Sequence, residues 1–249
     1  MTNNKRSQLK QIENIFINYY KKIGVLEDQK KDIKNYLSKF LRERFVERIL
    51  FTVMSELENI KLAEKSILIT GLSHELASVL LKWGAVPDNI TVADLCPQAI
   101  KKAKALFSSS IKFSKISLDK FSFNDDDFDI IVCFNYLSNI PVNEYIEKLA
   151  AEFYRVIKPG GVAFISFTNE IASYEDMQLS GLLRTYQPEE ILPYFKNYKL
   201  INLLHFFPYN FDLFFIENEH VFPKKIGYIE DILIEQNHRY TDSLLLLTK

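Results

Sequence analysis

Hydrophobic residues follow two different periods along this chain. In residues 5–23 they recur every three or four positions, which is the spacing of one apolar stripe on a helix. The positions are Leu9, Ile12, Phe16, Tyr19 and Ile23. Similar spacing continues to Leu57. We therefore expect residues 1–60 to form a helical segment of two or three helices that acts as a lid on the domain after it.

From residue 61 onward the apolar runs become short and alternate with helical stretches. The expected strands are 66–70, 90–94, 111–116, 128–134, 162–167, 200–207 and 243–247. The expected helices are 74–83, 97–106, 143–156 and a segment that begins at Pro188. Strands that alternate with helices of this length indicate βαβ units and a parallel sheet.

The fold class predicted is therefore α/β: a Rossmann-like, seven-stranded, mostly parallel sheet with an N-terminal helical segment. Residues 61–249 form the sheet domain, with an insertion at about 208–241 that is too long for a simple turn. The insertion is rich in aromatic residues. It either covers a binding site at the edge of the sheet or adds to the core.

Composition excludes several classes of protein. The chain is 47% hydrophobic and 25% charged with a net charge of −1, which is typical of a globular protein and argues against a strongly basic nucleic-acid binder. Its two cysteines, Cys96 and Cys133, lie in apolar runs, so we expect no disulfide framework and no metal site. No apolar run is long enough to span a membrane, and the N-terminus lacks the apolar core of a signal peptide. We expect a cytoplasmic protein that binds neither nucleic acid nor membrane, and the pattern leaves its oligomeric state open.

One motif points to a particular family. Lys158-Pro-Gly-Gly161 has proline and glycine at the two central positions of a tight turn, and it lies between an expected helix and an expected strand. Together with the strand at Asp127-Phe-Asp-Ile-Ile-Val132, this segment resembles the class I S-adenosylmethionine-dependent methyltransferases, over residues 67–168. The resemblance implies S-adenosylmethionine as cofactor, a small-molecule second substrate and no metal.

The resemblance also assigns cofactor-binding residues. Asp94 ends the second strand, where the family has an acidic residue that accepts hydrogen bonds from the ribose hydroxyls, and Leu95 follows it. The alternative role for Asp94 is to stabilise the start of the next helix. Ser117 and Leu118, at the end of the third strand, are expected to contact the adenine, with Asp119 as an alternative to Ser117.

The loop after the first strand departs from the family pattern of one acidic residue and three glycines. Gly71 retains the tight turn. Ile69 replaces the acid, and Ser73 and Glu75 replace the second and third glycines. We expect Gly71, Ser73 and Glu75 to contact the methionyl part of the cofactor, with the Glu75 carboxylate facing the ammonium group.

The residues after the fourth strand are expected to form the wall between methyl donor and acceptor. By the resemblance, Phe134 contacts the cofactor, while Asn135 and Tyr136 face the acceptor as catalytic candidates. The alternatives are that Asn135 is an ordinary loop residue and that Tyr136 belongs to the hydrophobic core. His205 is the candidate general base, because imidazole titrates near neutral pH, and His220 is the second candidate.

The function predicted is methyl transfer from S-adenosylmethionine to a small-molecule acceptor. A helical segment before such a sheet is also similar to the nicotianamine synthase type, which implies aminocarboxypropyl transfer or cyclisation of the cofactor's amino-acid part. The altered loop at 69–75 is expected to contact that same part of the cofactor, which supports this alternative. The third hypothesis is a non-catalytic binding module that has lost its cofactor, and it rests on Ile69 and Glu75 in that loop.

Overall fold

The computed structural model describes residues 60–71, 74–105, 110–117, 120–140, 143–169, 184–206 and 240–249, with isolated positions elsewhere. The side chains of His74 and Glu75 lie outside this description. Most of the predicted N-terminal segment and of the 208–241 insertion also lies outside it. Within the described residues, no helix is both long and apolar enough to cross a membrane.

One seven-stranded sheet organises the described residues, in the order β3-β2-β1-β4-β5-β7-β6. Strands β1 to β5 are parallel to one another, and β7 runs antiparallel to both β5 and β6. The strands are β1 (Ile67–Thr70), β2 (Ile90–Asp94), β3 (Lys112–Lys115), β4 (Phe128–Cys133), β5 (Ile157–Thr168), β6 (Lys199–Phe206) and β7 (Asp242–Thr248). The central strands β1, β2 and β4 are buried on both faces almost throughout, as helices on both sides of a parallel sheet require.

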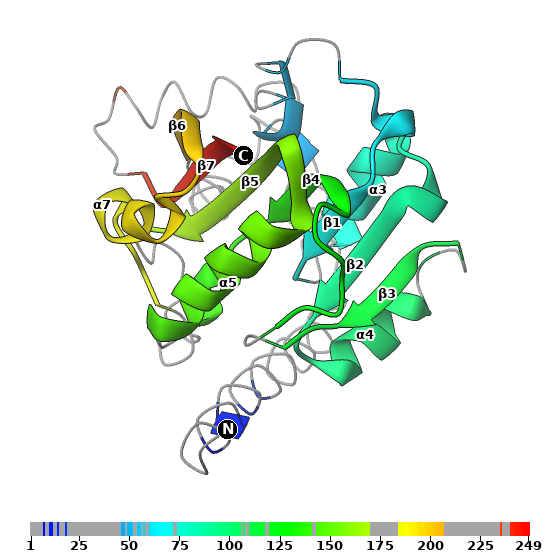
Figure 1. Ribbon diagram of the computed structural model, residues 1–249, viewed down its shortest axis with the longest axis horizontal. Helices are drawn as coiled ribbons and strands as arrows, with labels where there is room; N and C mark the ends of the chain where they lie inside the picture. Colours follow the sequence, from blue (N-terminus) through cyan, green and yellow to red (C-terminus); the bar gives the residue numbers. More distant parts are fainter. Residues whose placement is uncertain are drawn as a thin grey trace.

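Helices cover both faces of this sheet and form two hydrophobic clusters. Helix α5 (Asn143–Val156) packs on one face and lies in front of the sheet in Figure 1, together with α7 (Pro188–Ile191). Helix α3 (His74–Lys82) packs on the other face, where Ile49 and Leu50 of the N-terminal segment are also buried. Helix α4 (Pro97–Lys104) follows β2. Short 3-10 helices lie at Leu62–Glu64, Pro87–Asn89, Leu137–Asn139 and Leu192–Phe195.

The predicted fold class is confirmed, and each expected strand is present to within two residues at either end except the fifth. The fifth strand begins at Ile157 instead of Val162, because Lys158-Pro-Gly-Gly161 forms a bulge inside β5 and not a turn before it. Gly160 adopts φ +73° there, which a residue with a side chain adopts only with strain. Gly161 has no room for a Cβ, which would lie 2.9 Å from the Asp129 carbonyl oxygen.

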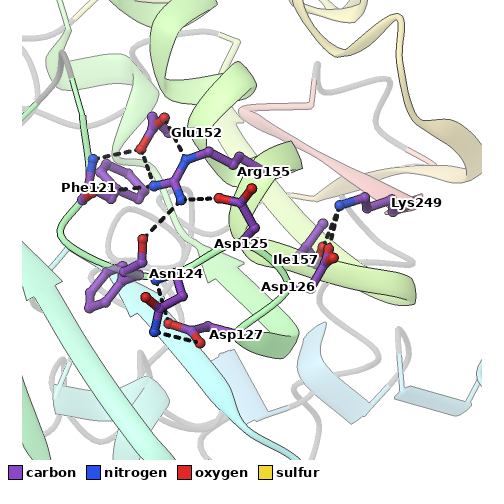
Figure 2. A network of polar contacts seen from close by, with 10 residues as sticks. Phe121, Asn124, Asp125, Asp126, Asp127, Glu152, Arg155, Ile157 and Lys249 are labelled. Atoms are coloured by element: carbon purple, nitrogen blue, oxygen red, sulfur yellow. Dashed lines mark hydrogen bonds and ion pairs between the residues drawn. The ribbon is translucent and has the colours of Figure 1, made fainter.

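At the amino-terminal edge of the sheet, Arg155 holds the loop that leads into β4 (Figure 2). Its guanidinium donates to both carboxylate oxygens of Glu152 at 3.0 and 2.7 Å, and to Asp125 at 2.7 Å. It also donates to the backbone carbonyls of Phe121 and Phe123. Burial raises the pKa of Glu152, but the hydrogen bonds from Arg155 and the Phe121 amide, together with the charges of Arg155 and Lys120, lower it overall. Arginine suits this position because its planar group presents five donors.

A second ion pair joins three strands at the same edge. Lys158 Nζ donates to the Asp129 carboxylate at 2.7 Å, and the same carboxylate oxygen accepts from Ser66, just before β1. Burial raises the pKa of Asp129, but the hydrogen bonds from Lys158 and Ser66 lower it to about 2. Ion pairs thus hold the amino-terminal edge of the sheet together, and the opposite edge is built differently.

Replacing Arg155 with alanine should lower the free energy of unfolding by about 2 kcal/mol, because it removes charge-assisted hydrogen bonds and leaves Glu152 half-buried without its partner. Urea denaturation followed by circular dichroism measures the change. The control is Lys61→Ala, which breaks an exposed ion pair with Glu64 and should change stability by less than about 0.5 kcal/mol. Equal effects of the two substitutions would contradict this role for Arg155.

Candidate functional site

The strand order reverses next to β1, and this reversal locates the candidate site. Successive strands add outward from β1 to β2 and β3, whereas β4 returns to the other side of β1. The helices after β1 and β4 therefore pack on opposite faces of the sheet. In open α/β sheets, ligands bind outside the carboxyl ends of the strands at such a reversal.

Gly71, directly after β1, packs against Tyr136, which follows β4. Gly71 adopts φ +84°, and a Cβ added to it would lie 3.1 Å from Tyr136 Cδ2. The Tyr136 side chain is 2% exposed, and its hydroxyl accepts a hydrogen bond from the Leu95 amide at 3.2 Å. One aromatic ring thus links the ends of β1, β2 and β4. The Leu95 amide is occupied by this bond.

Asp94 is completely buried at the end of β2. One of its carboxylate oxygens accepts a hydrogen bond from the Cys96 amide at 2.6 Å, immediately before α4. Both roles considered for this residue are compatible with that position: the carboxylate stabilises the turn into α4, and it lies at the strand end where the ribose is expected. A ligand reaches it only after the residues that cover it move.

The other residues predicted to bind the cofactor differ in where they lie. Ser117 is exposed just beyond β3, where the Ile116 amide donates to the Asp94 carbonyl at 3.0 Å. Phe134 is half-buried against the cluster on the α3 face. The backbone of Glu75 lies in the first turn of α3. Ser73, Leu118 and the alternative residues Asp119 and His220 lie outside the described residues.

Asn135 lies in a set of buried polar side chains at the ends of β4, β5 and β7. It adopts φ +48°, a left-handed conformation that asparagine tolerates better than most residues. Its amide donates to Ser166 Oγ at 2.9 Å, and its side-chain nitrogen donates to Asp242 at 3.0 Å. Ser166 in turn donates to the Asn135 side-chain oxygen. Asn135 is therefore held in one orientation by residues from two other strands.

The same edge contains further buried polar residues that the sequence analysis did not single out. Thr168 donates to Asp242, which is 3% exposed, and the Thr168 amide donates to Ser138 Oγ at 2.9 Å. Ser243, next to Asp242 on β7, is completely buried. Buried polar groups at one edge of an otherwise apolar sheet are typical of a binding site. Their signal in the sequence is the polar triplet Thr241-Asp-Ser243 before an apolar run, but it is informative only once β7 is known to be antiparallel.

His205 lies near the end of β6, at the same edge as the carboxyl end of β5. Its Nδ1 lies 2.9 Å from Ser243 Oγ, and its ring packs against Tyr240 with centroids 5.0 Å apart. Asn135, Tyr136 and His205 thus lie at one edge of the sheet, but Tyr136 is buried in the core while His205 is exposed. Cys133, at the end of β4, is not a nucleophile, because burial raises the pKa of its thiol to about 12.

Comparison with protein families agrees with this placement. Residues 70–165, from the end of β1 to the middle of β5, match the family model described as a methyltransferase domain. This part of the chain is therefore similar to the methyltransferase domains that the model describes. The matched residues of this methyltransferase domain include Gly71, Asp94 and the loop after β4, which carry most of the predicted site. No curated protein sequence matches the chain.

Solved structures share the methyltransferase fold at low sequence identity. An S-adenosylmethionine-dependent methyltransferase from Mesorhizobium loti is 15% identical, with a TM-score of 0.57 over 80% of this chain and 96% of that one. Phosphoethanolamine N-methyltransferase 2 from Haemonchus contortus, in complex with S-adenosyl-L-methionine, is 14% identical, with a TM-score of 0.56 over 80% of this chain and 51% of that one. The [4+2]-cyclase SpnF is 14% identical, with a TM-score of 0.53 over 82% of this chain and 80% of that one. At these identities the comparison shows a common fold.

The contact between Gly71 and Tyr136 leads to a paired test. Gly71→Ala should lower stability more than Gly84→Ala, by about 1 kcal/mol or more, because only the first adds a methyl group against a buried ring. Gly84 is the matched control: it has a similar φ of +96°, and nothing lies within 4 Å of an added Cβ. Thermal and urea unfolding of both variants measure the difference. Equal destabilisation would mean that the backbone conformation alone explains the glycine at position 71.

Proposed function

We propose that this methyltransferase domain binds S-adenosylmethionine at the carboxyl ends of β1, β2 and β3 and transfers its methyl group to a small molecule at the ends of β4, β5, β7 and β6. The observation that carries the proposal is the buried carboxylate of Asp94, which ends β2 beside the positive-φ turn at Gly71. The family match over residues 70–165 and the cofactor named for the relative from Haemonchus contortus support it.

In the cofactor half of the site, Asp94 accepts hydrogen bonds from the ribose hydroxyls. Such charge-assisted hydrogen bonds are stronger than neutral ones. Leu95 contributes its apolar side chain, because its amide already donates to Tyr136. Ser117 and Leu118 contact the adenine, and Gly71, Ser73 and Phe134 line the path toward the methyl group. The lid that the sequence predicts at residues 1–60 is part of this proposal, although most of these residues lie outside the described part of the chain.

The methionyl end of the cofactor is held differently from the family pattern. Ile69 stands where the family has an acid, and its side chain is completely buried in the core. It therefore offers no charge to an ammonium group. Glu75, in the first turn of α3, takes over this role, because a carboxylate that faced the cofactor's own carboxylate would be repelled in a partly desolvated site.

The acceptor half uses the buried polar residues at the ends of β4, β5 and β7. When bound, S-adenosylmethionine supplies an electrophilic methyl group on a positively charged sulfur. The protein then has to orient the acceptor for in-line attack and to exclude water. Asn135 suits this role, because three hydrogen bonds to Ser166 and Asp242 fix its backbone and side chain before any acceptor arrives. Tyr136 forms the wall between the two halves.

A non-catalytic binding module is the second candidate, and the altered loop favours it. The domain retains the sheet and the acidic residue at position 94, but two of the three loop glycines and the first acid are replaced. A [4+2]-cyclase shares this fold, so the fold alone does not determine which reaction the chain catalyses. Aminocarboxypropyl transfer and cyclisation use the same cofactor, so product analysis distinguishes them from methyl transfer.

Calorimetric titration with S-adenosylmethionine and S-adenosylhomocysteine tests the proposal. The wild-type chain should bind both, and Asp94→Asn should raise each dissociation constant more than about tenfold, because the amide accepts less strongly from the ribose hydroxyls. Asn keeps the size of the side chain and the oxygen that accepts from Cys96.

The matched control is Asp126→Asn at the opposite edge of the sheet. Asp126 has φ +56°, which asparagine tolerates, and it pairs with Lys249 at 2.7 Å (Figure 2). This variant should bind both ligands as the wild type does. Absence of binding to the folded wild type would favour the non-catalytic module, and unchanged binding by Asp94→Asn would overturn the role of Asp94.

A further inference from the structure

Three polar side chains form a chain of hydrogen bonds that ends on His205. His205 Nδ1 lies 2.9 Å from Ser243 Oγ, and Ser243 Oγ lies 2.7 Å from the side-chain oxygen of Asn169. The Asn169 side-chain nitrogen lies 2.8 Å from the backbone carbonyl oxygen of Tyr186. The residues come from β6, β7 and the end of β5, at the edge where the acceptor half of the site lies.

The direction of every hydrogen bond in this chain follows from its last member. The Tyr186 carbonyl only accepts, so Asn169 must turn its nitrogen toward it and its oxygen toward Ser243. That oxygen also only accepts, so the single hydroxyl proton of Ser243 is donated to Asn169. Ser243 is then left to accept from His205, and Nδ1 of the neutral ring carries the proton. The lone pair of His205 therefore resides on Nε2.

The surroundings of this ring favour its neutral form. Burial lowers the pKa of His205 below its usual value of 6.5, and the Glu189 carboxylate of α7 raises it by less. Among the residues that the structure describes, Ser243 of β7 and the Tyr240 ring contact the imidazole. His205 is nevertheless exposed, so that a ligand can reach its outer nitrogen.

We propose that Asn169 and Ser243 are positioning residues that hold His205 as the proton acceptor for the group that is methylated. The inference rests on the proposed methyl transfer and narrows the acceptor to a hydroxyl or a protonated amine. A hydroxyl passes its proton to His205 Nε2 as its oxygen forms the bond to the methyl carbon. A protonated amine passes its proton to Nε2 first, because only then does its nitrogen have the lone pair that attacks the methyl carbon. The bond between carbon and sulfur breaks, and its electron pair stays on sulfur. The hydrogen bonds that join His205, Ser243 and Asn169 set this tautomer before the acceptor binds.

Long-range ¹H–¹⁵N spectra of the full chain labelled with ¹⁵N-histidine test this arrangement at pH 7.5. His205→Gln identifies the resonances of His205 among the four histidines. The wild type should show Nδ1 protonated and Nε2 unprotonated. Asn169→Ala should move the proton to Nε2, because Ser243 is then able to donate to Nδ1. Ser243→Ala should give averaged shifts for both nitrogens, since the ring loses its fixed partner.

Ser138→Ala is the matched control, because Ser138 is an equally buried serine at the same edge that binds the Thr168 amide and not the ring. It should leave the His205 spectrum unchanged. Protonation of Nε2 in the wild type, or a spectrum that Asn169→Ala and Ser243→Ala leave unchanged, would overturn the inference. Titration of the wild type and of Ser243→Ala with S-adenosylmethionine separates the two proposals. The variant should bind the cofactor with the same affinity as the wild type. If the wild type binds no cofactor, the proposed function is refuted, whereas the assignment of the His205 tautomer is not.

Discussion

The reversal of strand order beside β1 is the constraint on which the site depends. Because β2 and β4 lie on opposite sides of β1, the helices that follow β1 and β4 cover opposite faces of the sheet. The segments that follow β1 and β4 therefore separate at the carboxyl edge, and the space between them is where ligands bind in such sheets. The amino edge carries ion pairs of Arg155 and Lys158 that close it, and the carboxyl edge carries hydrogen-bonded polar side chains. Ion pairs and buried, hydrogen-bonded polar side chains thus lie at opposite edges of one sheet.

Tyr136 connects the two halves of the carboxyl edge. Its ring packs on Gly71, its hydroxyl holds the Leu95 amide, and its neighbour Asn135 is tied to Ser166 and Asp242. Because Asn135 and Tyr136 are consecutive, a change in the contacts of Asn135 is linked to the turn after β1 and to the end of β2. The same burial places the Tyr136 side chain in the core and not on the exposed surface of this edge.

The sequence predicted the sheet and the positions of Gly71 and Asp94 at strand ends more completely than the contacts among β4, β6 and β7, for a physical reason. Short apolar runs and the positions of Gly71 and Asp94 are local signals, since each follows its own strand. The bulge at Lys158-Pro-Gly-Gly161 was expected as a turn, because pairing with β4 on both sides of it is a tertiary property. The contacts of Asn135 with Asp242 and of His205 with Ser243 join residues 107 and 38 positions apart. They exist only because β7 is antiparallel, which no local pattern indicates.

The central claim is that the carboxyl edge, from Gly71 to Asn135, is the ligand site. Amide hydrogen exchange of the full chain, with and without saturating S-adenosylhomocysteine, tests it most directly, because a bound ligand suppresses local opening where it binds. The account predicts slower exchange in residues 93–96 and 133–136 and unchanged exchange in residues 121–127 at the amino edge. Slower exchange confined to 121–127, or no change anywhere, would contradict it.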